Sequence, residues 1–506
     1  MLALWLVTAL AFARPSRKAP PPPPPPDPRV ELAATYPLGP LFSELVADRV
    51  FAESRVGAQV VDIATGDEVW AFDADAPLVP ASTMKVVTAA AALRSLGPAW
   101  RFRTTFLRDG EVTPEGILEG NLILRGNGDP TLVVEKLWKL VHDLQIEGVL
   151  EVSGDLILDA SYFGDGSLIP GWDKPLDIAN APSYFPPLSA LSVNFNTAAI
   201  VVAPGPKAGE PARVEVETPV DSIVVESTVT TIDERRKGWL KLEREADPKT
   251  GVLTFRLEGE VPAGGEVQRH YRGVADPLRH TADIVRALLK EEGIRVRGRV
   301  RFGPTPRTAE PVVELVSPPL AEILNHTNKF SSNFMAEQVL RAVGAEAKGA
   351  PGTTAKGIAV VSEYLGSLGI PAEEYVLVNG SGLSRDIRLR PTHLTAVMMD
   401  MARDPTIAPE FLATLSVAGV DGTLRRRFSG PDRLGRIRGK TGSLDGVQSV
   451  VAIAHAADGR SYTYALIVND FSRNRPVRSV HDRFGSLLIG GGVVSSPDED
   501  ADSGGP

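Results

Sequence analysis

The helix predicted over residues 82–93 constrains the fold of this chain more than any other stretch. Its alanine-rich sequence is a strong helix former, and Gly97-Pro98 ends it. Because the helix is apolar, we expect it to be buried inside a domain. Residues three apart share one face of a helix, so the hydroxyl of Ser82 and the amine of Lys85 can meet at its start.

Serine and lysine side chains in this arrangement can form a nucleophile and its base. A serine needs a base to become nucleophilic, and burial turns a lysine into a base because it penalises the charged form. The pKa of free lysine is about 10.4. A lysine that is neutral near pH 7 therefore needs a lower pKa, which corresponds to a free energy of deprotonation that is smaller by about 4 kcal/mol. By itself, the tetrad also fits an N-cap serine followed by a surface lysine.

The length and composition of the chain indicate a soluble protein of several domains. A chain of 506 residues is too long for one compact domain and suits two to four. The net charge of -9 argues against nucleic acid as a partner. Because the chain has no cysteine, disulfides, thiol catalysis and thiolate metal sites are excluded.

Both ends of the chain have the composition of segments outside a folded domain. Residues 1–13 are apolar and end in Ala11-Phe12-Ala13, which predicts a secretory signal peptide without a basic n-region and a periplasmic or secreted location. Residues 14–29 predict a proline-rich linker, and the acidic, glycine-rich residues 495–506 predict a disordered tail. No later stretch is long and apolar enough for a transmembrane helix.

The predicted elements divide the chain into an interrupted α/β domain and an insertion. Before residue 100, a helix over residues 41–51 and a hairpin of strands over 56–63 and 68–72 precede the Ser82 helix. The insertion predicts mainly short strands, and the α/β pattern returns after residue 306. Helices are predicted over residues 132–144, 283–292, 319–344, 354–368, 391–402, 408–414 and 476–488. The last three strands are predicted over residues 436–440, 447–454 and 461–468.

Two later motifs carry groups suited to the same chemistry. Ser331-Ser332-Asn333 places hydroxyls and an amide at a helix start, where a simple N-cap is the alternative. Lys440-Thr441-Gly442-Ser443 ends a strand, and its glycine bares the backbone so that a substrate can lie against the strand edge. A lysine beside a hydroxyl can hold a carboxylate, although a charged edge strand is also common.

The order Ser-x-x-Lys, Ser-x-Asn, Lys-Thr-Gly resembles the motif set of penicillin-binding proteins and serine β-lactamases. The long gap between Ser82 and Ser331 is similar to that of the D-alanyl-D-alanine carboxypeptidase/endopeptidase family, the type-4 low-molecular-mass penicillin-binding proteins. The resemblance covers roughly residues 40–490. Further stretches that resemble this family are residues 126–132, 189–196, 379–385 and 418–424.

The resemblance implies a multidomain α/β (α+β) fold. A β-lactamase/transpeptidase-like catalytic domain would comprise residues 30–99 and 306–494. Two smaller, mostly β domains would be inserted into it. Domain II would comprise residues 100–170 and 269–305, and domain III, residues 171–268, would be nested inside domain II.

The resemblance also implies a serine-type D-Ala-D-Ala carboxypeptidase/DD-endopeptidase that acts on peptidoglycan stem peptides and cross-links and is acylated by β-lactams. Ser82 would be the nucleophile and Lys85 its base, assisted by the second cation, Lys440. Ser331 would relay a proton to the leaving amine, and Asn333 would orient Lys85. The backbone N–H groups of Ser82 and Ser443 would form the oxyanion hole. No cofactor or metal is implied.

Six residues are predicted to contact the substrate. Thr441, Gly442 and Ser443 belong to the strand-edge motif. In the family that the chain resembles, an arginine at the position of Arg385 reaches the active-site mouth. Asp445 follows the Lys-Thr-Gly motif and is predicted to tune specificity. Asp159 ends a strand of the insertion and could hold the amino group of the diamino acid in the stem peptide, with a turn carboxylate as the alternative.

Four other functions compete with this prediction. A β-lactamase or an esterase on the same scaffold is disfavoured by the large insertion. A non-catalytic peptidoglycan-binding module would not need all the motif residues to be intact. The seven histidines show no metal-ligand spacing, which disfavours a zinc peptidase.

Overall fold

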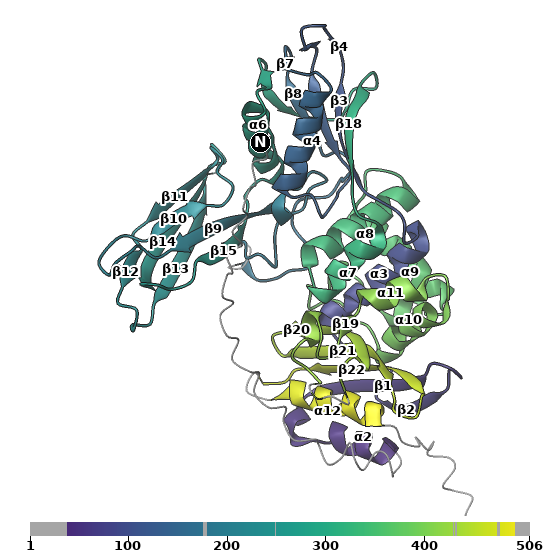
Figure 1. Ribbon diagram of the computed structural model, residues 1–506. Coiled ribbons are helices and arrows are strands. Elements are labelled where there is room, and N and C mark those ends of the chain that lie inside the picture. Colours follow the sequence, from purple (N-terminus) through teal and green to yellow (C-terminus); the bar gives the residue numbers. More distant parts are fainter. Residues whose placement is uncertain are drawn as a thin grey trace, which may run out of the picture.

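The computed structural model describes residues 38–175, 180–247, 249–428, 430, 433–472 and 476–490. The predicted signal peptide (1–13), linker (14–29) and tail (495–506) lie outside these residues. Figure 1 shows a body of helices and one sheet, a mixed unit next to the helices, and an all-β unit beside the mixed unit. In the described part of the chain, no helix is long and apolar enough to cross a membrane.

The sheet of the body is built from both ends of the chain. Its strands follow the order β19-β20-β21-β22-β1-β2, and every neighbouring pair is antiparallel. They are β1 (Arg55–Asp62), β2 (Glu68–Phe72), β19 (Ser416–Val417), β20 (Ile437–Leu444), β21 (Val447–His455) and β22 (Ser461–Asn469). Because β1 pairs with β22 along its whole length, the hairpin that precedes the Ser82 helix shares one sheet with the C-terminal strands.

Alternate residues of the central strands face two different helical layers. On β21, Val450 packs in the cluster with α2 (Leu38–Val46) and α12 (Val477–Gly490), whereas Val451 packs in the cluster with the larger helical layer. This alternation follows from the two-residue period of a strand with both faces covered. The larger layer contains α3 (Met84–Leu96), α7 (Leu320–Lys329), α8 (Asn333–Lys348), α9 (Thr354–Ser367), α10 (Pro391–Arg403) and α11 (Ala408–Thr414).

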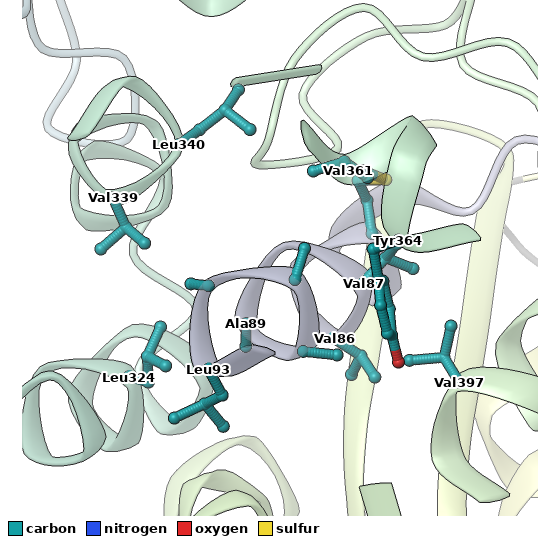
Figure 2. Close-up of a cluster of buried hydrophobic side chains, with 14 of the residues drawn as sticks. Val86, Val87, Ala89, Leu93, Leu324, Val339, Leu340, Val361, Tyr364 and Val397 are labelled. Carbon is teal, nitrogen blue, oxygen red and sulfur yellow. The ribbon is translucent and has the colours of Figure 1, made fainter. Parts of the chain in front are cut away.

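Helix α3 is the centre of this layer. Every residue from Met84 to Leu93 is buried, as the apolar sequence predicts. Figure 2 shows side chains of α7, α8, α9 and α10 surrounding it, among them Leu324, Val361 and Val397. Burying one such aliphatic side chain contributes roughly 1.5–3 kcal/mol, so α3 is fixed firmly enough to hold a reactive group at its N-terminus.

Two predicted helices are interrupted in the structure. The helix predicted over residues 41–51 consists of α2 and a separate 3₁₀ turn, Arg49–Phe51, because the Asp48 side chain accepts a hydrogen bond from the N–H of Val50 (2.9 Å). The helix predicted over 319–344 is broken between α7 and α8. Ser331 adopts a left-handed conformation there (φ 57°), which a continuous helix does not allow.

The mixed unit contains two sheets and two helices. Its five-stranded sheet has the order β17-β8-β6-β3-β18, and its four-stranded sheet has the order β16-β7-β5-β4. Its helices are α4 (Val134–Ile146) and α6 (Pro277–Glu291). Its strands are β3 (Arg103–Arg108), β4 (Glu111–Val112), β5 (Ile117–Glu119), β6 (Leu122–Gly126), β7 (Glu151–Val152), β8 (Leu156–Asp159), β16 (Arg295–Val296), β17 (Val300–Phe302) and β18 (Glu310–Val316).

The predicted limits of the insertion differ from the strand pairing. β18 lies after residue 305 but pairs with β3, so the boundary at 305/306 divides a sheet and has to move beyond Val316. Helix α6 starts before the predicted residue 283. The Asp276 carboxylate caps it by accepting from the N–H of Leu278 (3.0 Å), and Pro277 occupies its first turn.

The all-β unit contains one three-stranded and one four-stranded sheet. The first has the order β10-β9-β15; in the second β14 pairs with β11, β12 and β13. The strands are β9 (Thr197–Ala203), β10 (Arg213–Val216), β11 (Ile223–Ser227), β12 (Thr230–Ile232), β13 (Trp239–Ala246), β14 (Leu253–Pro262) and β15 (Gln268–Gly273). β15 pairs with β9 along its whole length, so this unit extends past the predicted boundary at residue 268.

Candidate active site

Ser82 lies on a short 3₁₀ turn, Ala81–Thr83, that leads directly into α3. The preceding segment is anchored to the sheet. The Ser449 hydroxyl donates to the Pro80 carbonyl (2.6 Å), and the Asn469 side chain accepts from the N–H of Val79 (2.7 Å). Ser82 itself is half-buried. The turn therefore presents its hydroxyl from a fixed backbone.

Lys85 is completely buried and reaches three oxygen atoms. Its Nζ lies 2.8 Å from Ser82 Oγ, 2.7 Å from Asn333 Oδ1 and 2.6 Å from the carbonyl oxygen of Ser381. The carbonyl can only accept a hydrogen bond. The Asn333 amide is oriented by its Nδ2, which donates to the Tyr184 carbonyl (2.8 Å), so its Oδ1 also accepts.

These contacts define what a neutral Lys85 can do. A neutral amine has two N–H bonds and one lone pair. The two acceptors, Asn333 Oδ1 and the Ser381 carbonyl, use both N–H bonds, and the lone pair is left for the hydroxyl of Ser82. The geometry therefore suits transfer of the Ser82 proton to Lys85.

The electrostatic surroundings favour the neutral amine. Burial lowers the pKa of Lys85 well below its ordinary value, and the nearby Lys440 lowers it further. The carboxylate of Glu337 acts in the opposite direction and raises it. The first two effects are those expected from the sequence, whereas the contribution of Glu337 is new.

The two serines of the Ser331-Ser332-Asn333 motif make different contacts. Ser332 is the N-cap of α8, and its Oγ accepts from the N–H of Met335 (3.2 Å). The N-cap alternative is therefore correct for this one serine. The left-handed conformation of Ser331 leaves its hydroxyl 2.8 Å from the Nζ of Lys440.

Lys440 lies on β20 and is also completely buried. Besides Ser331, its amine donates to the Thr441 carbonyl (2.7 Å). Burial lowers the pKa of Lys440 to about 7. The second lysine thus changes its charge near neutral pH.

Glycine at position 442 is required by the distance between β20 and the Ser82 turn. A Cβ atom on Gly442 would lie 2.6 Å from the Pro80 carbonyl oxygen and 2.8 Å from the Ser82 backbone nitrogen. This close approach places the following residue, the exposed Ser443, next to the nucleophile. The sequence predicted that glycine bares the strand backbone to a substrate, whereas at position 442 the missing side chain makes room for the Ser82 turn.

Glu337 is a residue of the site that the sequence reasoning missed. It is fully buried on α8, and its two carboxylate oxygens accept from the N–H groups of Ser381 (2.7 Å) and Gly380 (3.2 Å). Burial raises its pKa, while these hydrogen bonds and Arg341 act against that rise. Glu337 thereby holds the loop whose Ser381 carbonyl contacts Lys85. The available signal was an acidic residue that follows the apolar stretch 334–336, one helical turn after Asn333.

Arg385 and Asp445 meet beyond the end of β20. A guanidinium nitrogen of Arg385 donates to the Asp445 carbonyl (2.8 Å), and the Asp445 carboxylate pairs with Lys174 (2.9 Å). The Lys174 amine in turn lies 5.4 Å from the centre of the Trp172 ring. The two predicted substrate residues are thus in direct contact, and a segment of the insertion reaches Asp445 through Lys174.

Asp159 has different surroundings. Its carboxylate accepts from the N–H groups of Ser161 (2.8 Å) and Thr305 (2.7 Å). Burial acts to raise its pKa, but hydrogen bonds from these two residues outweigh it and lower the pKa. All these contacts lie within the mixed unit, as expected for a turn carboxylate, and the structure does not bring Asp159 into contact with the motif residues.

An antiparallel sheet covered by helices, with a serine–lysine pair beside a second buried lysine, is typical of the active-site-serine enzymes that include penicillin-binding proteins and β-lactamases. The D-Ala-D-Ala carboxypeptidase 3 (S13) family matches residues 42–486. The chain belongs to this family and is a serine-type D-Ala-D-Ala carboxypeptidase. The predicted family and the multidomain α+β fold class are confirmed.

Individual relatives agree with this assignment. A D-alanyl-D-alanine carboxypeptidase of an Actinomadura species is 32% identical over 437 residues, which cover 83% of this chain and 79% of the relative. The D-alanyl-D-alanine carboxypeptidase DacB of Haemophilus influenzae is 27% identical over 430 residues, covering 83% and 86%.

Solved structures show the same likeness. The crystal structure of penicillin binding protein 4 from Haemophilus influenzae is similar with a TM-score of 0.75 and 26% identity, covering 88% of this chain and 98% of that one. A crystal structure of the same protein complexed with a β-lactam has a TM-score of 0.71 and 25% identity, with the same coverage of the two chains.

Proposed function

We propose that Ser82 and Lys85 carry out the hydrolysis of D-Ala-D-Ala bonds through an acyl-enzyme. Ser82 Oγ attacks the carbonyl of the penultimate D-alanine, and Lys85 takes the hydroxyl proton. The observation that carries this proposal is the pair of acceptors on Lys85, which leaves its lone pair for Ser82. The N–H groups of Ser82 and Ser443 stabilise the oxyanion, each worth about 3–4 kcal/mol in the transition state.

The remaining motif residues complete the cycle. When the tetrahedral intermediate collapses, the C–N bond breaks and the leaving amine receives a proton through Ser331, whose hydroxyl contacts Lys440. Water then attacks the ester on Ser82 and releases the shortened stem peptide. Lys440, together with the hydroxyls of Thr441 and Ser443, holds the carboxylate of the terminal residue, because a cation beside hydroxyl donors suits a carboxylate.

The same chemistry extends to cross-linked peptidoglycan and to β-lactams. In a cross-link, the leaving amine belongs to a diamino acid instead of a free D-alanine, which makes the reaction that of a DD-endopeptidase. A β-lactam presents a strained amide to Ser82 and leaves a stable ester there. Arg385 and Asp445, which contact each other beyond β20, select the leaving residue.

The architecture and location of the enzyme follow as further proposals. Among the described residues, 38–99 form the catalytic domain with the C-terminal part of the chain after Val316, and the two inserted units approach the substrate. A signal peptide over residues 1–13 exports the chain to the periplasm or the medium, where peptidoglycan is found.

Incubation with purified muropeptides tests this function. Mass spectrometry is expected to show loss of one D-alanine from pentapeptides and cleavage of D-Ala–diamino acid cross-links. Ser82→Ala is expected to abolish both reactions while the protein stays folded. Unchanged muropeptides with the wild-type protein would contradict the proposal.

A further inference from the structure

Two segments of the insertion, residues 169–172 and 182–188, lie against the candidate active site. Their buried side chains pack with the start of α8, with the loop that carries Ser381 and with the end of β20. These side chains, which we call the junction cluster, are Ile169, Phe185, Leu188, Phe334, Met335 and Leu383, with Trp172 and Leu444 packed against them. Each partner of the insertion in this cluster carries a group of the site: Asn333 on α8, Ser381 on the loop and Ser443 on β20.

The insertion fixes the first hydrogen-bond acceptor of Lys85. The side-chain amide of Asn333 could present either its oxygen or its NH₂ group to the lysine. The Tyr184 carbonyl decides between them: it can only accept, so it takes a hydrogen of Nδ2 (2.8 Å) and leaves Oδ1 facing the lysine (2.7 Å). Phe185, the next residue, anchors this carbonyl in the junction cluster, because its ring is 2% exposed and stacks on Trp172 at 6.0 Å between ring centres. The orientation of a motif side chain therefore depends on the insertion.

The insertion also fixes the second acceptor, the Ser381 carbonyl. Asn379, a fully buried residue of the same loop, donates from Nδ2 to the Pro170 carbonyl of the insertion (2.8 Å). The insertion approaches the loop closely at Gly171, where an added Cβ would lie 2.7 Å from the hydroxyl oxygen of Ser384. The loop that presents the Ser381 carbonyl to Lys85 is therefore bonded to the insertion and packed tightly against it.

Both N–H bonds of a neutral Lys85 amine are thus aimed by contacts with the insertion. If either acceptor moves, the amine turns with it, and its lone pair no longer points at Ser82 Oγ, which lies 2.8 Å away. Reaction rates depend steeply on such alignment, and a misplacement of about 1 Å can slow a reaction about a hundredfold. A change in the insertion can therefore slow the reaction without touching the substrate.

We propose that the insertion positions the catalytic base Lys85 by holding both of its hydrogen-bond acceptors. Phe185 and Asn379 are the positioning residues. Phe185 fixes the Tyr184 carbonyl, and Asn379 ties the second acceptor's loop to the insertion. The inference rests on the proposed function, because the two acceptors matter to the reaction only if Lys85 takes the serine proton. It adds that the insertion is part of the catalytic geometry, besides any contact that it makes with the substrate.

Stopped-flow acylation by a chromogenic β-lactam tests the proposal, because a β-lactam carries no stem peptide for the insertion to bind. The concentration dependence separates the affinity of the noncovalent complex from the first-order acylation constant. Phe185→Leu should lower the acylation constant about tenfold to a hundredfold, because the base is misaligned. The affinity should stay unchanged, since the Phe185 side chain is buried in the junction cluster.

Phe255→Leu is the matched control, because Phe255 is a buried phenylalanine of β14 in the core of the all-β unit. Both substitutions remove the same atoms from a packed core and should lower Tm by similar amounts. Only Phe185→Leu should slow acylation. Equal acylation constants in the two variants would overturn the proposal, and so would a slower reaction of Phe185→Leu that comes entirely from weaker binding.

Asn379→Asp is the second variant, and it decides the proposal if Phe185→Leu does not fold. It keeps the shape of the side chain but places an oxygen where Nδ2 faces the Pro170 carbonyl, so that two acceptors meet. It should show the same loss in the acylation constant at unchanged affinity, and a wild-type constant would overturn the proposal. A wild-type protein that is not acylated on Ser82 would overturn the proposed function and this inference together, whereas an acylated wild type with unaffected variants would overturn this inference alone.

Discussion

Glu337 controls both the position and the basicity of Lys85. The variant Glu337→Gln tests this role against that of a buried residue that only contributes to folding. Glutamine has nearly the same shape but replaces one carboxylate oxygen with an NH₂ group. One of the two backbone N–H groups, of Ser381 or Gly380, would then face a donor in place of an acceptor. The loop that carries the Ser381 carbonyl would lose its anchor, and Lys85 would lose a defined partner.

The size of the effect follows from these bonds. A hydrogen bond to a charged group contributes about 1.5–3 kcal/mol, so acylation of Ser82 should slow roughly tenfold to a hundredfold. The charge has a second effect. Because Glu337 raises the pKa of Lys85, its removal lowers that pKa further. The active form is the neutral amine, so the acidic limb of the pH–rate profile should move to lower pH.

Stopped-flow acylation by a chromogenic β-lactam, followed from pH 4 to 9, measures both quantities. Glu363→Gln is the matched control, because Glu363 forms a surface ion pair with Lys348 and is far more exposed. Such pairs contribute about 0–1 kcal/mol, and the control should acylate like the wild type. A Glu337→Gln protein with the wild-type rate and an unshifted acidic limb would refute this account of Glu337.

Three further predictions concern other parts of the site. Gly442→Ala should lower the stability by about 1–3 kcal/mol through overpacking and slow acylation, because its Cβ would approach the Ser82 nitrogen to 2.8 Å. Gly303→Ala is the control, because its added Cβ meets no described atom within 4 Å, and equal Tm and acylation rate in the two variants would contradict the close approach. Lys440 has a pKa of about 7 and loses its charge as the pH rises, so kcat/KM for substrates with a terminal carboxylate should fall above about pH 7; a flat profile up to pH 9 would exclude a carboxylate-holding role. If Asp159 binds substrate, Asp159→Ala should slow hydrolysis of cross-linked muropeptides about tenfold or more and leave the rate of acylation by β-lactams unchanged. An equal loss of both rates would show that Asp159 only stabilises its turn with Thr305.

The parts of the fold that could be predicted are those encoded by local patterns. The buried helix after Ser82 follows from its alanine-rich sequence, and the hairpin of β1 and β2 follows from alternating residues around a turn. The pairing of β18 with β3 could not be predicted, because it joins segments some two hundred residues apart and leaves no local pattern in the sequence. The change in sequence pattern alone therefore placed the boundary at residue 305, before β18, the last strand of the sheet along the chain.

The residues of the candidate active site also differ in whether the sequence alone could reveal them. Ser82, Lys85, Ser331, Asn333 and Lys440 belong to motifs whose order is visible in the chain, and the structure brings them into contact. Glu337 acts through the backbone of a loop that is adjacent only after folding. His280 is a buried residue of α6, and within the described part of the chain neither of its ring nitrogens has a hydrogen-bond partner. A sequence does not show which buried polar groups remain unsatisfied.

The most direct test of the central claim is to locate the acyl group that a penicillin leaves on the protein. The wild-type protein is treated with a fluorescent penicillin, digested, and analysed by mass spectrometry, with Ser82→Ala treated in parallel. We predict a single adduct on the peptide that contains Ser82 and no labelling of the variant. An adduct on another residue, or full labelling of Ser82→Ala, would contradict the assignment of Ser82 as the nucleophile.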